Sequence, residues 1–122
     1  MNQKTKNIID WVLAGLVGFI FVGSGINKLV GGEEALKMAS GMGLSPSAFT
    51  SIAVIELISV VLFIIPRTGI LGTLLLAAYM GGAIATHLEH DMSVVPPAAI
   101  AAFVWIAAVV RFPELRSRLL GN

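Results

Sequence analysis

The sequence predicts an all-α integral membrane protein, a four-helix bundle with both termini in the cytoplasm. Of its 122 residues, 57% are hydrophobic and only 12% are charged, whereas about 25% of residues in soluble domains carry a charge. Four apolar runs each come close to the ~20 residues that a helix needs to cross the hydrocarbon core of a bilayer. A chain of this length cannot hide so much apolar surface from water, so a single transmembrane domain over residues 1–122 is expected.

The first two transmembrane helices are expected over about residues 8–30 and 47–65. Lys4 and Lys6 precede the first apolar run. Ser45 and Pro46 begin the second helix, as an N-cap followed by a proline at the first helical position. Pro66 ends it, because the residue before a proline is pushed out of helical geometry.

The third and fourth helices are expected over about residues 69–88 and 95–111. The connection between the second and third helices is very short, which makes them antiparallel neighbours. Pro96 and Pro97 begin the fourth helix, and Pro113 follows its end. An outer loop at 31–46 and a cytoplasmic tail at 112–122 complete the chain.

The outer loop contains a segment, residues 33–38, that is expected to form a short interfacial helix. Glycines on both sides of this segment are typical of hinges. The loop is either a solvated connector or a gate over an outward-facing cavity.

The basic residues predict the orientation of the bundle. Only Lys28 and Lys37 fall on the side of the outer loop. The opposite side carries the other six, which are Lys4, Lys6, Arg67, Arg111, Arg116 and Arg118. By the positive-inside rule, this side faces the cytoplasm, and the expected location is the cytoplasmic (inner) membrane.

The composition also excludes several classes of function. The chain has no cysteine, which excludes disulfides, thiol catalysis, Cys-ligated zinc and iron–sulfur clusters. A net charge of +1 gives no electrostatic reason to expect a nucleic acid partner. His87 and His90 have metal-ligand spacing only if the third helix continues through both, and we predict neither a metal site nor a catalytic residue.

Glu56 is the most informative residue, because it lies near the middle of the second apolar run. A carboxylate at mid-bilayer needs a partner, a proton or water. The default interpretation is a functional residue that faces the bundle interior, and the alternative is a carboxyl group that only packs against a neighbouring helix.

Polar residues on the neighbouring helices predict a pocket around Glu56 in the outer half of the bundle. Ser24 and Lys28 share a face of the first helix, and Tyr79 and His87 share a face of the third. Each has a simpler role as an alternative, such as a headgroup anchor for Lys28. The expected ligand-binding residues are Ser24, Asn27, Lys28, Glu56, Tyr79 and His87.

The pattern resembles the DoxX-like family of small four-helix membrane proteins. The segments that carry the resemblance are residues 23–29 (GSGINKL), Glu56–Leu57, residues 62–66 (LFIIP), residues 81–88 (GGAIATHL), Pro96–Pro97 and Arg111. Where relatives commonly have Gly-Asp after the histidine of the third helix, this chain has His90–Asp91. The resemblance implies Lys28, Glu56 and His87 as site residues.

The family includes a membrane subunit of a thiosulfate:quinone oxidoreductase, members associated with quinone or oxidative stress, and more distantly a receptor-assembly chaperone. The resemblance therefore implies a pocket for a lipophilic ligand, with a quinone as the favoured cofactor, or a membrane subunit of a redox system rather than a stand-alone enzyme. The alternatives are an assembly subunit that docks a partner protein and a small proton-coupled transporter. Expected partners are membrane lipids, a lipophilic small molecule, and a second copy of the chain or a redox partner protein.

Overall fold

The computed structural model describes residues 2–121, and every regular element in that range is helical. The expected domain also includes residues 1 and 122, which lie outside the described residues. In chain order the elements are α1 (Gln3–Val30), α2 (Glu33–Gly41), α3 (Pro46–Ile64), η1 (Pro66–Thr68), α4 (Gly69–Glu89), α5 (Val95–Arg111) and α6 (Pro113–Leu120). The all-α class is therefore confirmed.

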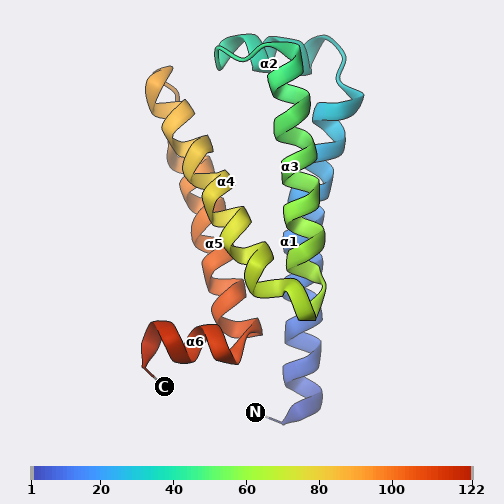
Figure 1. Ribbon diagram of the computed structural model, residues 1–122, viewed down its shortest axis with the longest axis vertical. Helices are drawn as coiled ribbons and strands as arrows, with labels where there is room; N and C mark the ends of the chain where they lie inside the picture. Colours follow the sequence, from blue (N-terminus) through green and yellow to red (C-terminus); the bar gives the residue numbers. More distant parts are fainter. Residues whose placement is uncertain (1, 122) are drawn as a thin grey trace.

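The long helices run up and down, and the short helices lie across the two ends (Figure 1). The main packing interfaces join α1 with α3, α3 with α4, and α4 with α5, with a smaller one between α1 and α5. The upper halves of α4 and α5 lean away from α1 and α3, toward the end that α2 crosses. Both chain termini lie at the opposite end, beside α6.

Three segments are long and apolar enough to cross a membrane: α1, α3, and η1 together with α4. The fourth expected span, α5, has 17 residues. It reaches the same criteria only together with α6, from which it is bent by 108°. Residues 2–121 thus contain three candidate membrane spans by length and composition, with the bent pair α5–α6 as a candidate fourth.

Several helix ends differ from the sequence-based expectation for local reasons. Helix α1 begins at Gln3 rather than near residue 8, because the Asn2 side chain accepts a hydrogen bond from the backbone N–H of Thr5 at 2.8 Å. The expected interfacial helix of the outer loop extends to Gly41. The segment expected to be a cytoplasmic tail, residues 112–122, contains a further helix, α6.

The end of α3 is stabilised by residues from elsewhere in the chain. Pro66 has no N–H to donate to the carbonyl of Leu62, which instead accepts from the Thr68 hydroxyl at 2.9 Å. Arg111, at the end of α5, donates to the next two carbonyl groups, those of residues 63 and 64, at 2.9 and 3.3 Å. The α3–η1 turn is therefore fixed to the end of α5.

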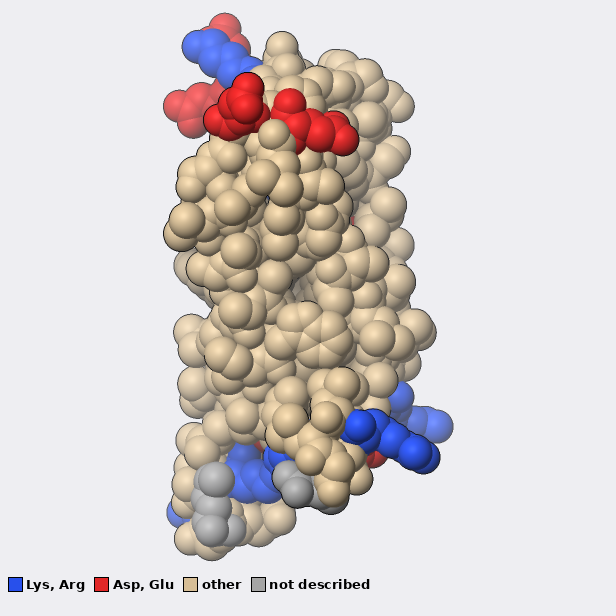
Figure 2. Space-filling model, turned by 90° about the vertical axis from the view of Figure 1, so that its left-hand side faces the viewer, with Lys and Arg blue, Asp and Glu red and all other residues tan. Residues whose placement is uncertain are grey.

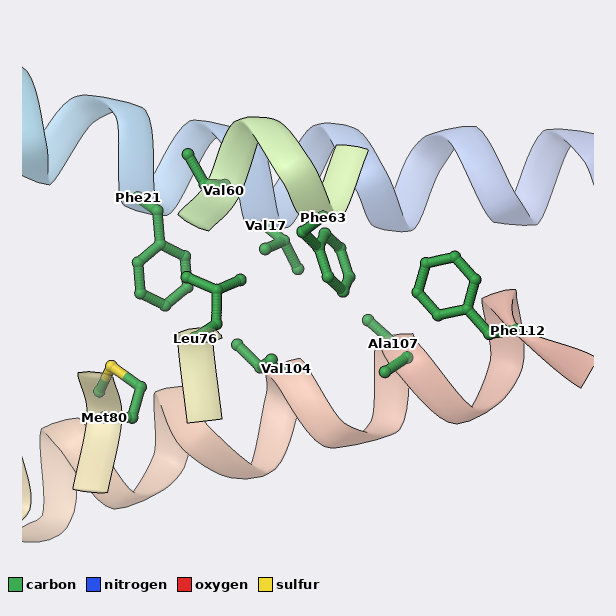
Figure 3. Close-up of a cluster of buried hydrophobic side chains, with 10 residues drawn as sticks. Val17, Phe21, Val60, Phe63, Leu76, Met80, Val104, Ala107 and Phe112 are labelled. Atoms are coloured by element: carbon green, nitrogen blue, oxygen red, sulfur yellow. The ribbon is translucent and has the colours of Figure 1, made fainter. Parts of the chain in front are cut away.

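An apolar core fills the space between the long helices. Figure 3 shows side chains of α1, α3, α4 and α5 directed toward one another. Gly72 of α4 lies against the backbone of α3, where an added Cβ would come within 2.1 Å of the nitrogen of Phe63. A glycine at this point lets the two helix backbones approach closely, which stabilises helix pairs in lipid.

Candidate functional site: a buried ion pair among three helices

Glu56 lies on the inner face of α3, in the same helix face as the buried residues Ala53 and Val60. Only 2% of its side chain is exposed. The helix period of 3.6 residues sets this position, since residues three and four apart lie on the same face. A carboxyl group is thus held among apolar side chains and depends on polar neighbours from other helices.

Lys28 of α1 is the ionic partner of Glu56. Its Nζ lies 2.8 Å from Oε1 of Glu56 and 2.5 Å from Oγ of Ser24, one turn earlier in α1. The Lys28 side chain is 14% exposed, so the ammonium group is less enclosed than the carboxylate. The pair connects α1 to α3 near the α2 end of the molecule.

Tyr79 of α4 completes the contacts of the carboxylate. Its hydroxyl group donates to Oε1 of Glu56 at 3.0 Å. Its ring and that of Phe21 form a T-shaped pair with a centroid distance of 6.3 Å, and Nζ of Lys28 lies 6.0 Å from the centroid of the Tyr79 ring. We call Ser24, Lys28, Glu56 and Tyr79 the polar cluster; it ties together α1, α3 and α4.

Two residues expected in the site are not in contact with the polar cluster. Asn27 is exposed, because a helix turns by 100° per residue and only Lys28 points inward. His87 lies eight residues after Tyr79, roughly 12 Å further along α4, in the half of the helix that leans away. Its Nδ1 atom lies 2.7 Å from the carbonyl oxygen of Ala83 in its own helix.

A second buried charge, Arg111, was not among the expected site residues. It is 7% exposed, and its guanidinium group lies between the rings of Phe63 and Phe112, at 4.9 and 5.0 Å from their centroids. The signal that points to it is Pro66, which interrupts the hydrogen bonds at the end of α3 and leaves carbonyl groups in need of a donor. Arg111 therefore stabilises the end of α3 and is not part of the polar cluster.

The structure offers few other candidate sites. Within residues 2–121 no group of three His, Cys, Asp or Glu side chains is placed to hold a metal ion. Two shallow surface hollows are lined by residues 57, 58, 61 and 62, and by residues 7, 8, 11 and 12. Neither includes a member of the polar cluster. The two charged side chains of the cluster are largely buried, and Lys28, 14% exposed against 2% for Glu56, is the more accessible of the two.

Comparison with known proteins identifies one family. The model of the DoxX-like family matches residues 12–110, which include α3 and α4, all of α5 except its last residue, α1 from Val12 onward, and the whole polar cluster. Neither the curated proteins nor the solved structures give a significant match. Since the family model covers most of the sequence, the chain belongs to the DoxX-like family.

Proposed function

We propose that this DoxX-like membrane protein binds a lipophilic ligand at the polar cluster, with a quinone as the favoured class, and serves as a membrane subunit of a redox system. The observation that carries the proposal is the ion pair between Lys28 and Glu56, formed within helices of membrane-spanning length. Ionisable residues inside such helices are costly and usually mark functional sites.

The remaining hydrogen-bonding capacity of the polar cluster fits both oxidation states of a quinone. The Lys28 ammonium group has three donors, and it uses two of them on Ser24 and Glu56. Both hydrogen bonds that Glu56 receives from residues 2–121 fall on Oε1. A quinone carbonyl would therefore accept from Lys28, and a quinol hydroxyl would donate to Oε2 of Glu56.

The test is a titration of the protein in nanodiscs with a ubiquinone analogue, followed by quenching of the native tryptophans. We expect Lys28→Gln and Glu56→Gln each to weaken binding at least about tenfold, because each removes a charge-assisted hydrogen bond. Lys37→Gln is the matched control, since it removes a basic residue near the same end of the molecule, outside the cluster. Equal affinity of all four proteins would refute the proposal.

A second candidate is an assembly subunit that docks a partner membrane protein or a second copy of the chain. Four glycines favour it, because nothing lies within 4 Å of a Cβ added at Gly15, Gly23, Gly81 or Gly82. Such faces let another helix approach closely. A partner that co-purifies with Glu56→Gln and is lost in Gly23→Leu would support this candidate; proton flux into liposomes that requires Glu56 would support the transporter alternative.

We infer further that the protein resides in the inner membrane with both termini in the cytoplasm. Six of the eight basic residues belong to the segments near the termini and the α3–α4 connection, as the positive-inside rule requires. The test is a pair of C-terminal fusions in a bacterial host. We expect a fluorescent C-terminal green fluorescent protein and an inactive alkaline phosphatase, and the reverse result would overturn this orientation.

A further inference from the structure

Helix α6 lies across the end of the bundle that carries the chain termini (Figure 1). It is bent by 108° from α5, and Pro113 begins it after an extended residue, Phe112. Arg116 holds the bend, since its guanidinium group donates to the carbonyl groups of Val109 and Val110 at 3.3 and 3.5 Å. If α5 follows the other long helices through the bilayer, α6 runs close to the membrane plane.

The residues of α6 suit a helix at the boundary between headgroups and acyl chains. Leu115 packs against the apolar core. Leu119 and Leu120, one turn further, are 53% and 59% exposed, and Arg118 beside them is also exposed. Short helices that combine exposed leucines with basic residues bind the interface of a bilayer.

The charges of the molecule are divided between its two ends. The end with α6 has six Lys and Arg residues against Asp10 and Glu114, a net charge of +4. At the opposite end, outside the polar cluster, four acidic residues stand against Lys37. Figure 2 shows the acidic side chains gathered mainly at one end and the basic ones mainly at the other. Anionic groups are therefore attracted to the α6 end.

Two basic residues at this end are free to bind such a group. Arg67, in η1 between α3 and α4, and Arg118 are both exposed. Within residues 2–121, neither makes a side-chain hydrogen bond or an ion pair. Arg67 sits where the chain turns between two membrane-spanning segments, at the level expected for lipid phosphates.

We propose that the α6 end is a binding surface for anionic phospholipids, in which α6 lies in the headgroup layer with Leu119 and Leu120 at the acyl boundary. Arg67 and Arg118, supported by Lys4 and Lys6, bind the lipid phosphates. The occupant is a lipid because these side chains surround the ends of the spans, where headgroups are the neighbouring molecules. Of these basic residues, Arg67 lies within the family match over residues 12–110, whereas Lys4, Lys6 and Arg118 lie outside it.

The experiment measures which lipid contacts α6. Leu120→Trp, in a background with Trp11→Phe and Trp105→Phe, places one fluorophore on α6 of the full chain in vesicles. Brominated phosphatidylglycerol and brominated phosphatidylcholine then compete to quench it. We expect both to quench, phosphatidylglycerol to bind at least about 25-fold better, and the preference to fall about fivefold with each of Arg67→Gln and Arg118→Gln.

The controls separate this surface from general effects of charge and folding. Lys37→Gln removes one basic residue at the opposite end and is expected to leave the preference unchanged, and Arg118→Lys is expected to retain most of it. Circular dichroism verifies that each variant keeps its helix content. A tryptophan that no brominated lipid quenches, an equal response to both lipids, or an equal loss of preference in Lys37→Gln would overturn the proposal.

Discussion

Replacing Gly72 with alanine is expected to break the close approach of α3 and α4. The added Cβ would lie 2.1 Å from the nitrogen and 2.5 Å from the Cα of Phe63, and 2.6 Å from the carbonyl carbon of Leu62. All three are backbone atoms, so no side chain can rotate away to relieve the overlap. The helices themselves have to separate.

The distances give the size of the effect. Non-bonded heavy atoms essentially never approach a Cβ closer than 3.0 Å, so α3 has to move by at least 0.9 Å at this contact. A gap of roughly 0.5–1 Å removes a quarter to a half of the attraction between packed atoms. Val60, Phe63 and Leu76 all pack without exposed surface in this region. We expect Gly72→Ala to lower the free energy of unfolding by about 3 kcal/mol or more.

The assay is unfolding by sodium dodecyl sulfate from mixed micelles, followed by circular dichroism. The matched control is Gly81→Ala in the same helix, where nothing lies within 4 Å of the added Cβ. We expect this control to leave the free energy of unfolding unchanged or to raise it by up to about 1 kcal/mol, because alanine favours helix more than glycine does. Equal stability of the two variants would show that the α3–α4 packing described above is wrong.

The same unfolding assay tests five further variants. Tyr79→Phe removes one hydrogen bond to a carboxylate and should cost about 1 kcal/mol; no loss would show that this bond is not formed. Lys28→Met should cost about 3 kcal/mol because it leaves a buried charge unpaired, and the double variant Lys28→Met/Glu56→Gln should cost less than the sum of its single changes. Strict additivity would contradict the ion pair. Arg111→Lys should cost about 1–2 kcal/mol, since lysine cannot bind two carbonyl groups while stacking between two phenylalanine rings. Gly43, in the turn between α2 and α3, has a φ of +71°, so Gly43→Ala should cost about 1 kcal/mol, and an unchanged stability would refute that turn geometry.

The sequence predicts the long helices well because lipid leaves few alternatives. A run of about 20 apolar residues has to satisfy its own backbone hydrogen bonds, and a helix does so. The prolines and caps then set the ends, as at Pro46 and Pro66. What composition could not reveal is the direction of α6, because the bend at Phe112 depends on contacts of Arg116 with carbonyl groups of α5.

The polar cluster shows where reasoning from the sequence succeeds and where it stops. Helix periodicity places Ser24 and Lys28 on one face, and comparable depth in the membrane pairs Glu56 with Tyr79; the structure brings these four together. His87 follows the same periodicity from Tyr79 but lies too far along a helix that diverges from its neighbours. The crossing angle of two helices depends on side-chain packing along their whole length, which a pattern of spacings does not contain.

The contacts of Arg111 have a consequence for how the protein is made. The carbonyl groups of Phe63 and Ile64, at the end of α3, accept hydrogen bonds from Arg111, which is 48 and 47 residues further along the chain. During synthesis, these carbonyl groups therefore lack the Arg111 donor until α5 has been made. Helix α5 thus stabilises the end of α3 only after α5 itself has been synthesised. Nascent chains released before residue 111 should therefore be better substrates for membrane proteases than chains that include Arg111.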